Sequence, residues 1–228
     1  MLFTKVQSFR DVLLKHFNPN GMVIIDVGCG TGDLVRFLTS NCAKVIGVDS
    51  ADLIEKAKSY PAICDEEYLI GTAQNMEFEE NSADLIIFFA SFHHIPEIDM
   101  KFVIDKCHYI LKPNGHLVFL EPVEQEGSYY ELTRLIEDES EIQMKAYNHI
   151  LSACQNSFCS VNESFYFVER SFQDFQNLIN IFVKNDEERK KIVTKALEIV
   201  KKKNGTIETV RFPSYARLNM IKKSTLLM

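Results

Sequence analysis

The sequence of 228 residues has no tryptophan, only nine glycines and six prolines, and it lacks any long hydrophobic segment. Its longest uncharged apolar run, residues 85–92, is far too short to cross a bilayer. Charged and apolar residues alternate over residues 1–17 and leave no apolar core for a signal peptide. We therefore expect a cytoplasmic protein with no membrane partner.

Metal-binding patterns are also missing. The six cysteines form no C-x-x-C pair, and no histidine–cysteine cluster has the spacing of a zinc site. We expect reduced thiols in an intracellular protein and no bound metal ion.

An excess of basic residues is absent as well. Thirty-two acids against 25 bases give a net charge of −7, which disfavours a nucleic-acid partner because the mean field repels phosphates. The most basic stretch, residues 189–203, alternates with apolar residues at helical spacing, which is typical of one solvated helix face.

What is present is a regular alternation of short apolar runs with helical patterns. This alternation predicts an α/β fold whose mostly parallel sheet is covered by helices on both faces. A first helix is expected over residues 5–17. Strands are expected at 22–27, 44–48, 67–70, 85–89 and 116–120, with helices at 31–40, 51–60 and 99–111.

The second half has a different pattern. Residues 128–158 are helical in pattern and are expected to cover the carboxyl edge of the sheet. A strand at 163–168, helices at 172–183 and 186–203 and a last strand at 215–222 complete the expected elements. No linker divides the chain, so we expect one domain.

A glycine-rich turn follows the first strand of this alternation. Residues 23–33 read VIIDVGCGTGD, with Asp26 before glycines 28, 30 and 32 and a helix after them. Glycine is required where the backbone turns tightly or a ligand touches it, and ligands of such sheets bind outside the carboxyl ends of strands. Three alternate glycines favour a nucleotide-type site over a bare turn.

Asp49 ends the next strand and is suited to accept hydrogen bonds from both ribose hydroxyls of a nucleotide. The alternative is a helix N-cap, a role for which Ser50 competes. Dinucleotide enzymes use a similar acid, so Asp49 alone does not identify the cofactor. The spacing of the glycines argues against a dinucleotide, because a dinucleotide fingerprint would need glycine where Asp33 stands.

The G-x-G-x-G turn resembles motif I of class I S-adenosylmethionine (SAM)-dependent methyltransferases. Three later segments resemble that family in order: GTAQNMEF at 71–78, DLIIFFASFHHIP at 84–96 and LKPNGHLVFLE at 111–121. Thr72 replaces the family's acid beside the adenine, and its hydroxyl can accept one hydrogen bond from the adenine amine without charge assistance. Adenine binding would then also depend on the Ala73 N–H or on Gln74. Asn114 replaces a glycine in a structural turn and tolerates the left-handed conformation.

The resemblance implies a Rossmann-like doubly wound sheet of seven strands, mostly parallel with an antiparallel last strand, and a small helical insertion after the fifth strand. It implies a single domain made of an N-terminal helix (1–20), a cofactor-binding half (21–122), a helical cap (123–160) and C-terminal strands and helices (161–228). The implied cofactor-binding residues are Asp26, Gly28, Cys29, Gly30, Gly32, Asp49, Ser50, Thr72, Ala73, Gln74, Phe89 and Ala90.

Methyl transfer from SAM is a direct in-line displacement that leaves S-adenosylhomocysteine (SAH), so the protein chiefly holds two reactants in position. If the acceptor must lose a proton, the candidate bases are His93, His94, Glu121 and His149, and His94 is the one expected nearer the ligand. The alternative for Glu121 is a cap or salt bridge at the strand end. Aromatic residues that either line an acceptor pocket or simply pack are Tyr129, Tyr130, Tyr147, Phe158 and Phe165.

The small insertion and the acidic charge favour a small-molecule acceptor. A non-catalytic SAM-binding protein and a protein methyltransferase stay open as alternatives. A nicotinamide-dependent oxidoreductase is disfavoured, because the sequence has neither the dinucleotide spacing nor a Tyr-x-x-x-Lys motif.

Overall fold

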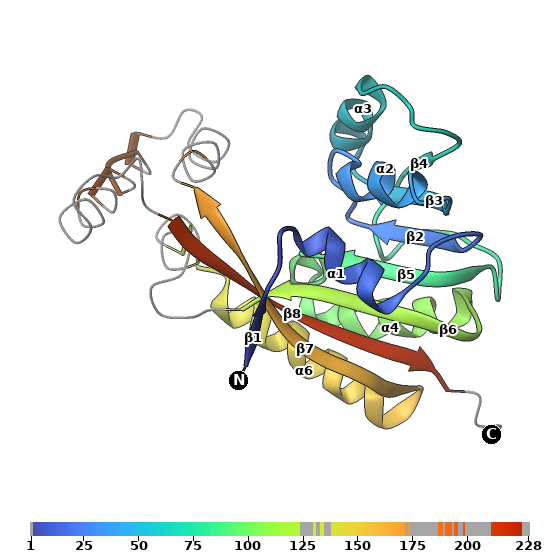
Figure 1. Ribbon diagram of the computed structural model, residues 1–228. Helices are drawn as coiled ribbons and strands as arrows, with labels where there is room; N and C mark the ends of the chain where they lie inside the picture. Colours follow the sequence, from blue (N-terminus) through green and yellow to red (C-terminus); the bar gives the residue numbers. More distant parts are fainter. Residues whose placement is uncertain are drawn as a thin grey trace. The chain divides into compact units, whose positions relative to one another are not determined.

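The structure is a computed structural model that describes residues 2–123, 130, 133–134, 138–171, 173, 187–188, 190–192, 194–195, 198 and 211–224 (Figure 1). The chain forms two compact units. The smaller comprises Met1–Phe9, Pro122–Glu141 and Phe165–Ala216, and the larger comprises Arg10–Glu121, Ile142–Ser164 and Arg217–Met228.

The elements of the first half are β1 (Phe3–Lys5), α1 (Phe9–His16), β2 (Val23–Val27), α2 (Asp33–Thr39), β3 (Lys44–Asp49), α3 (Ala51–Ser59), β4 (Glu67–Ile70) and β5 (Ala83–Phe89). After them come η1 (Phe92–His94), α4 (Glu97–Ile110), β6 (Leu111–Pro122), α6 (Ser140–Asn156), β7 (Phe158–Ser171) and β8 (Arg211–Lys223). Among the helices of the described residues, none combines the length and apolarity that crossing a membrane requires.

The strands form one sheet in the order β1-β7-β8-β6-β5-β2-β3-β4. β2 is parallel to β3 and to β5, β4 is parallel to β3, and β6 is parallel to β5. Figure 1 shows β8 running against β6 and β7. The predicted α/β class, with a mostly parallel sheet and an antiparallel last strand, is therefore confirmed.

In the part of the chain that the structure describes, the sheet has eight strands rather than the predicted seven, because β1 adds one at the edge. β1 pairs in parallel with β7, with Phe3 opposite Phe165, and the Phe3 ring packs edge-on against Tyr215 at 4.5 Å. The prediction of a helix from residue 5 was wrong, since α1 begins at Phe9. A strand of three residues is too short to produce a readable hydrophobic period.

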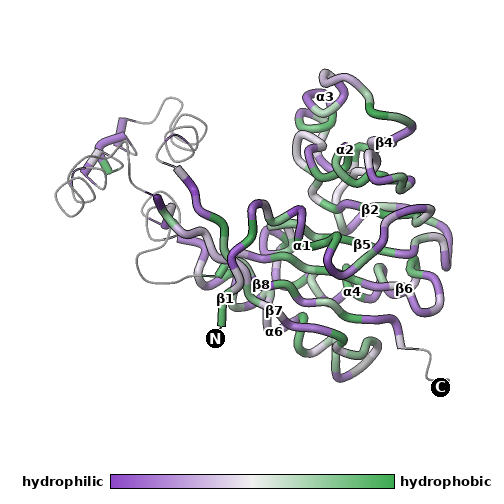
Figure 2. Tube along the Cα trace, in the orientation of Figure 1, coloured by the Kyte–Doolittle hydropathy of each residue, from purple (hydrophilic) through white to green (hydrophobic). Residues whose placement is uncertain are grey.

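Side-chain alternation along the strands gives the larger unit two apolar faces. On one face, Val27, Phe88 and Phe119 form a buried cluster with residues of α4 and α6. The alternate residues Ile24 and Leu85 face the other side and are also buried, as are Val12 and Leu13 of α1 and Leu34, Val35 and Leu38 of α2. Figure 2 shows hydrophobic stretches following the central strands and hydrophilic residues at the outer turns of the helices.

The LKPNG segment is built differently from the predicted turn between helix and strand. α4 ends at Ile110, and the segment is the first part of the single long strand β6. Between the pairs Ala83–Leu111 and Leu85–His116 the register shifts by a β-bulge, where Asn114 has a φ of 68°. The left-handed conformation expected at Asn114 is confirmed, and the bulge accommodates it inside a strand.

In the second half, α6 lies within the helical pattern predicted for 128–158, and β7 and β8 are longer than the predicted strands 163–168 and 215–222. The helices predicted at 172–183 and 186–203 fall mostly outside the described residues, as does Tyr129.

Candidate functional site

The larger unit has a cavity of about 280 Å³ at the carboxyl ends of β2, β3 and β5. It is lined by Val27, Gly28, Val48, Asp49, Ser50, Gly71, Thr72, Ala73, Gln74, Phe88, Ser91, His94, Ile95 and Pro96. Seven of these residues were predicted from the sequence as site residues: Gly28, Asp49, Ser50, Thr72, Ala73, Gln74 and His94. The segments that carry them are far apart in the chain, and the parallel strands bring their ends together.

The glycine loop connects β2 to α2 and has a backbone that only glycine adopts easily. Gly28, Gly30 and Gly32 all have positive φ, at 77°, 56° and 77°. A Cβ on Gly28 would lie 2.5 Å from the Cβ of Ser91, and one on Gly32 would lie 2.5 Å from the Tyr68 hydroxyl. At Gly30 a Cβ would meet no atom within 4 Å, so the loop is open on that side.

Asp49 fixes the end of β3 to this loop. Its Oδ2 accepts the Gly30 N–H at 2.7 Å, and its Oδ1 accepts the Ser50 N–H at 2.7 Å. The N-cap position of α3 belongs to Ser50, with extended φ and ψ of −60° and 156°. Asp49 is therefore not the cap of that helix, and each of its oxygens retains a lone pair for a ligand in the cavity.

Asp26 lies on β2 below the loop and is only 1% exposed. Neither of its carboxylate oxygens has a hydrogen-bond partner among the described residues. Burial, with a smaller contribution from the Asp49 charge, raises its pKa from 3.8 to about 7. Burial also raises the pKa of the neighbouring Cys29 thiol above its usual range, so Cys29 is not a reactive thiolate.

The turn after β4 is held by its own side chains. Asn75 Oδ1 accepts the Thr72 N–H at 2.6 Å, and the Thr72 hydroxyl accepts the Asn75 N–H at 3.3 Å. The Gln74 side chain donates to Asp99 at 3.1 Å. Within the described part of the chain, the backbone N–H groups of Ala73 and Gln74 are left without an acceptor. They are therefore the open donors of this wall of the cavity.

Glu121, at the end of β6, is 2% exposed and faces the turn that follows β5. Its Oε1 accepts the N–H groups of Ser91 at 3.3 Å and Phe92 at 3.0 Å, and its Oε2 contacts Nδ1 of the buried His93. The sequence left open whether Glu121 caps a strand end or reaches the active site. In the structure its carboxylate caps the start of η1. Of the two histidines, His94 is exposed and lines the cavity, with its ring 4.1 Å from that of His93.

Seven cavity residues were not predicted: Val27, Val48, Gly71, Phe88, Ser91, Ile95 and Pro96. Ser91 was detectable, since a hydroxyl directly after a buried strand lies at the ligand edge of the sheet. It donates to the Val27 carbonyl at 2.6 Å. Phe88 lines the cavity, whereas Phe89, whose backbone was expected to contact the cofactor, is not among the lining residues. Other expected residues that do not line it are Asp26, Cys29, Gly30, Gly32, Ala90, His93 and Glu121.

The aromatic residues considered for an acceptor pocket have separate roles. Phe158 belongs to the buried cluster of the larger unit, and Phe165 packs on Phe3 in the smaller one. The Tyr147 hydroxyl donates to Glu163 at 2.9 Å, and the Arg217 guanidinium lies over its ring at 3.4 Å. Tyr130 is 8% exposed. Packing is therefore the observed role of Phe158 and Phe165.

Comparisons with known proteins agree with this geometry. Residues 24–115 match the family described as methyltransferase domain. The chain is 31% identical over 122 residues to the ubiquinone biosynthesis O-methyltransferase of Nitrobacter winogradskyi, covering 49% of this chain and 46% of that protein. It is also 31% identical over 112 residues to the demethylmenaquinone methyltransferase of Thermotoga maritima, covering 48% and 46%. The chain thus spans about half the length of these curated relatives.

The fold has a counterpart along nearly the whole chain. The crystal structure of the YcgJ protein from Bacillus subtilis superposes with a TM-score of 0.65 and covers 95% of this chain and 98% of its own, at 18% identity. At that identity the likeness concerns the fold alone. The match to the methyltransferase domain implies SAM as the methyl donor. All the residues that line the cavity lie within residues 24–115, the part of the chain that matches the methyltransferase domain family.

Proposed function

We propose that this protein binds SAM in the cavity and transfers its methyl group to a small-molecule acceptor, with SAH as the product. The observation that carries the proposal is the meeting of three features in one cavity. These are the Gly28 end of the glycine loop, the fixed Asp49 carboxylate and the open N–H groups of residues 73 and 74.

These groups fit the parts of the cofactor. Asp49 has the acceptor capacity for two ribose hydroxyls, and the N–H groups of Ala73 and Gln74 donate to the adenine edge. The Thr72 hydroxyl accepts the Asn75 N–H within its turn and carries no charge, so we assign the main role in adenine recognition to the backbone N–H groups. We place the amino-acid end of the cofactor along the glycine loop, where a Cβ on Gly30 would meet no atom within 4 Å, and, as the family resemblance implies, near the backbone of residues 89–90.

SAM, when bound, supplies a methyl group activated by the positive charge on its sulfur. The protein's contribution is to orient the two reactants and exclude water. His94 lies at the rim of the cavity and is our candidate to accept a proton from the acceptor. Glu121 and His93 act as positioning residues, since the Glu121 carboxylate holds the turn that carries His94.

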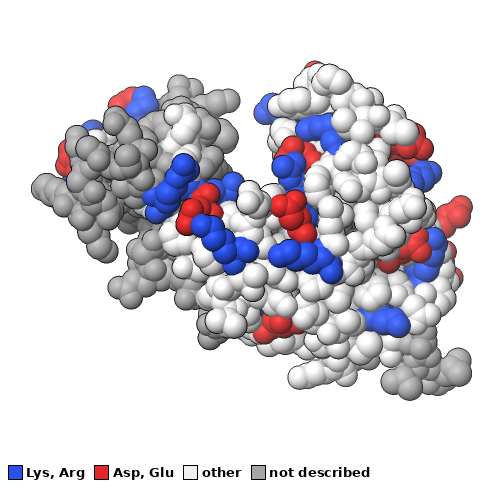
Figure 3. All heavy atoms as spheres, viewed as in Figure 1, with Lys and Arg blue, Asp and Glu red and all other residues white. Residues whose placement is uncertain are grey.

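A small-molecule acceptor is favoured over nucleic acid or protein. The net charge is −7, and Figure 3 shows acidic and basic residues interspersed on the visible face. The two curated relatives carry names from quinone metabolism, so hydroxylated or electron-rich aromatic rings are the first acceptors to screen. A SAM-binding protein without transferase activity is the second candidate, and it would show binding without turnover.

The proposal is tested by calorimetric titration of the protein with SAM, SAH and NAD. We expect micromolar binding of SAM and SAH and weak binding of NAD. Asp49→Ala should reduce SAH binding by at least about 1 kcal/mol, the scale of a lost charge-assisted hydrogen bond. Asp52→Ala is the matched control, because Asp52 is an exposed acid three residues further on. Tight NAD binding without SAM binding would refute the proposal.

A further inference from the structure

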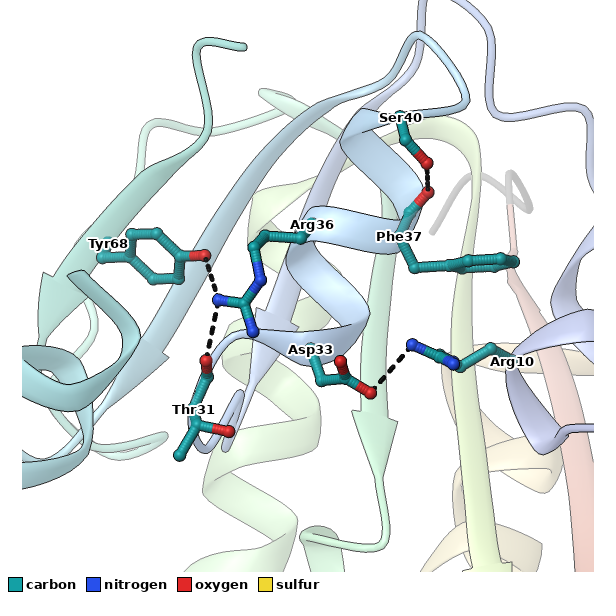
Figure 4. A network of polar contacts seen from close by, with 7 residues as sticks. All are labelled: Arg10, Thr31, Asp33, Arg36, Phe37, Ser40 and Tyr68. Atoms are coloured by element: carbon teal, nitrogen blue, oxygen red, sulfur yellow. Dashed lines mark hydrogen bonds and ion pairs between the residues drawn. The ribbon is translucent and has the colours of Figure 1, made fainter. Parts of the chain in front are cut away.

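Arg36, on α2, reaches back to the glycine loop without lining the cavity. Its Nη1 donates to the Thr31 carbonyl at 2.9 Å and lies 3.5 Å from the Tyr68 hydroxyl. Its guanidinium also lies over the Tyr60 ring, 4.5 Å from the centroid. Figure 4 shows the side chain between the loop on one side and Tyr68 of β4 on the other.

Tyr68 supports the same part of the loop. Its hydroxyl and two ring carbons would lie within 2.5–2.9 Å of a Cβ on Gly32, so the ring occupies the space that a side chain there would fill. Tyr68 comes from the edge strand β4, whereas Arg36 comes from the helix that the loop leads into. The loop between Gly30 and Gly32 is thus held from behind by two elements.

Such support has a physical purpose. Glycine populates positive and negative φ about equally, so three glycines with positive φ lose much conformational freedom when the loop is ordered. The N-cap of α2, Gly32, provides no side-chain hydrogen bond to fix the start of the helix. If the loop is already ordered in the free protein, binding does not have to supply this entropic cost, and the affinity for the ligand is higher.

We propose that Arg36, together with Tyr68, is a positioning residue that pre-forms the glycine loop and thereby sets the affinity for the amino-acid end of the cofactor. The inference rests on the proposed function, because it takes SAM and SAH as the ligands of this loop. Arg36 reaches the ligand only through the Thr31 carbonyl and the loop backbone. Its loss should therefore weaken ligands that contact the loop and spare ligands that do not.

The experiment compares two ligands by calorimetry. SAH carries the amino-acid end, and 5′-methylthioadenosine has the same nucleoside and a thioether but no amino acid. Arg36→Met keeps the apolar stem and removes the donors. We expect it to weaken the binding of SAH about tenfold, which is the scale of one lost charge-assisted hydrogen bond. The binding of methylthioadenosine should weaken less than about twofold, because this ligand lacks the part that contacts the loop. Arg36→Lys should fall in between, since lysine keeps the charge but not the planar fork.

Arg10→Met is the matched control. Arg10 also contacts α2, donating to Asp33 at 2.8 Å with its guanidinium 5.2 Å from the centre of the Phe37 ring, but it has no bond to the loop carbonyl (Figure 4). It should change binding of either ligand less than about twofold, as for an exposed pair. Equal losses for both ligands in Arg36→Met, or an unchanged SAH affinity, would overturn the inference.

Two further outcomes are separable. If the unsubstituted protein binds neither SAH nor methylthioadenosine, the proposed function itself fails, whatever the variants do. If Arg36→Met does not fold, Arg36→Lys and Tyr68→Phe decide. Tyr68→Phe removes only the hydroxyl that Arg36 approaches, so a selective loss of SAH binding in either variant supports the inference and parallel losses reject it.

Discussion

The Gly30 N–H donates to Oδ2 of Asp49 across 2.7 Å, so the glycine loop and the end of β3 are joined before any ligand binds. The other oxygen of the same carboxylate accepts the Ser50 N–H. Asp49 therefore serves the architecture of the cavity as well as its recognition chemistry. A carboxylate is required for this double task, because it alone offers an acceptor oxygen to each N–H group.

Asp49→Asn should consequently destabilise the ligand-free protein. An amide has one acceptor oxygen, so either the Gly30 or the Ser50 N–H would face an NH₂ group. We expect the free energy of unfolding to fall by about 1–2 kcal/mol, as for a lost hydrogen bond to a charged group that is partly exposed. Chemical denaturation measures this, with Asp52→Asn as the control. Equal stability of Asp49→Asn and the unsubstituted protein would contradict the bonding described.

The buried carboxyl of Asp26 should make stability depend on pH. Its pKa is raised from 3.8 to about 7 in the folded protein, so the folded state favours the protonated form. The contribution of this raised pKa to the free energy of unfolding is fully present below about pH 4 and is lost as the pH rises through 7. The total loss in the free energy of unfolding between these pH values has an upper limit of about 4 kcal/mol.

Asp26→Asn should remove that dependence. In ligand-free protein the variant should gain stability over the unsubstituted chain as the pH rises from 4 to 7, and the difference should then level off. Unfolding by urea at several pH values measures the difference. Asp84→Asn is a suitable comparison, because Asp84 is 30% exposed and paired with Lys112. A difference that does not change with pH would show that Asp26 ionises normally.

The sequence predicted much of the fold because its strands are short, apolar and bounded by turns. The strand expected at 67–70 has those bounds in the structure, and the strand expected at 44–48 gains only Asp49. β1 could not be predicted, since its three residues are stabilised by pairing with a strand about 160 positions later. Such pairing leaves no periodic signal in the local sequence.

The site was predictable where one rule applied. Residues that follow the carboxyl ends of parallel strands meet at one edge, and this rule found Gly28, Asp49 and His94. The pairing of Glu121 with the N–H groups after β5 was not predictable, because the partners are about 30 residues apart and β6 contains a bulge. Side-chain direction at a strand end depends on register, which a single sequence does not reveal.

Gly28→Ala should be costly for two separable reasons. A Cβ at this position would lie 2.5 Å from the Ser91 Cβ, and φ is +77°. Gly21 has nearly the same φ of +75° but open space around it, so Gly21→Ala measures the conformational cost alone. We expect about 1 kcal/mol for Gly21→Ala and an additional 1–3 kcal/mol, approximately, for Gly28→Ala from the steric clash. Thermal or chemical unfolding measures the stability of both variants. Equal losses of stability in Gly21→Ala and Gly28→Ala would mean that Ser91 moves aside freely.

Glu121→Ala should be the most destabilising of these changes, because it removes the acceptor of the Ser91 and Phe92 N–H groups and the contact with the buried His93 ring. Each unsatisfied buried donor costs about 1–3 kcal/mol, so a loss of at least about 3 kcal/mol is expected. Glu67→Ala is the control: its pair with Lys44, at 3.2 Å, is about half exposed and contributes less than about 1 kcal/mol. Urea unfolding compares the two variants. If Glu121→Ala were as mild as Glu67→Ala, the carboxylate would not be holding η1, and its burial beside His93 would call for a direct role in proton transfer instead.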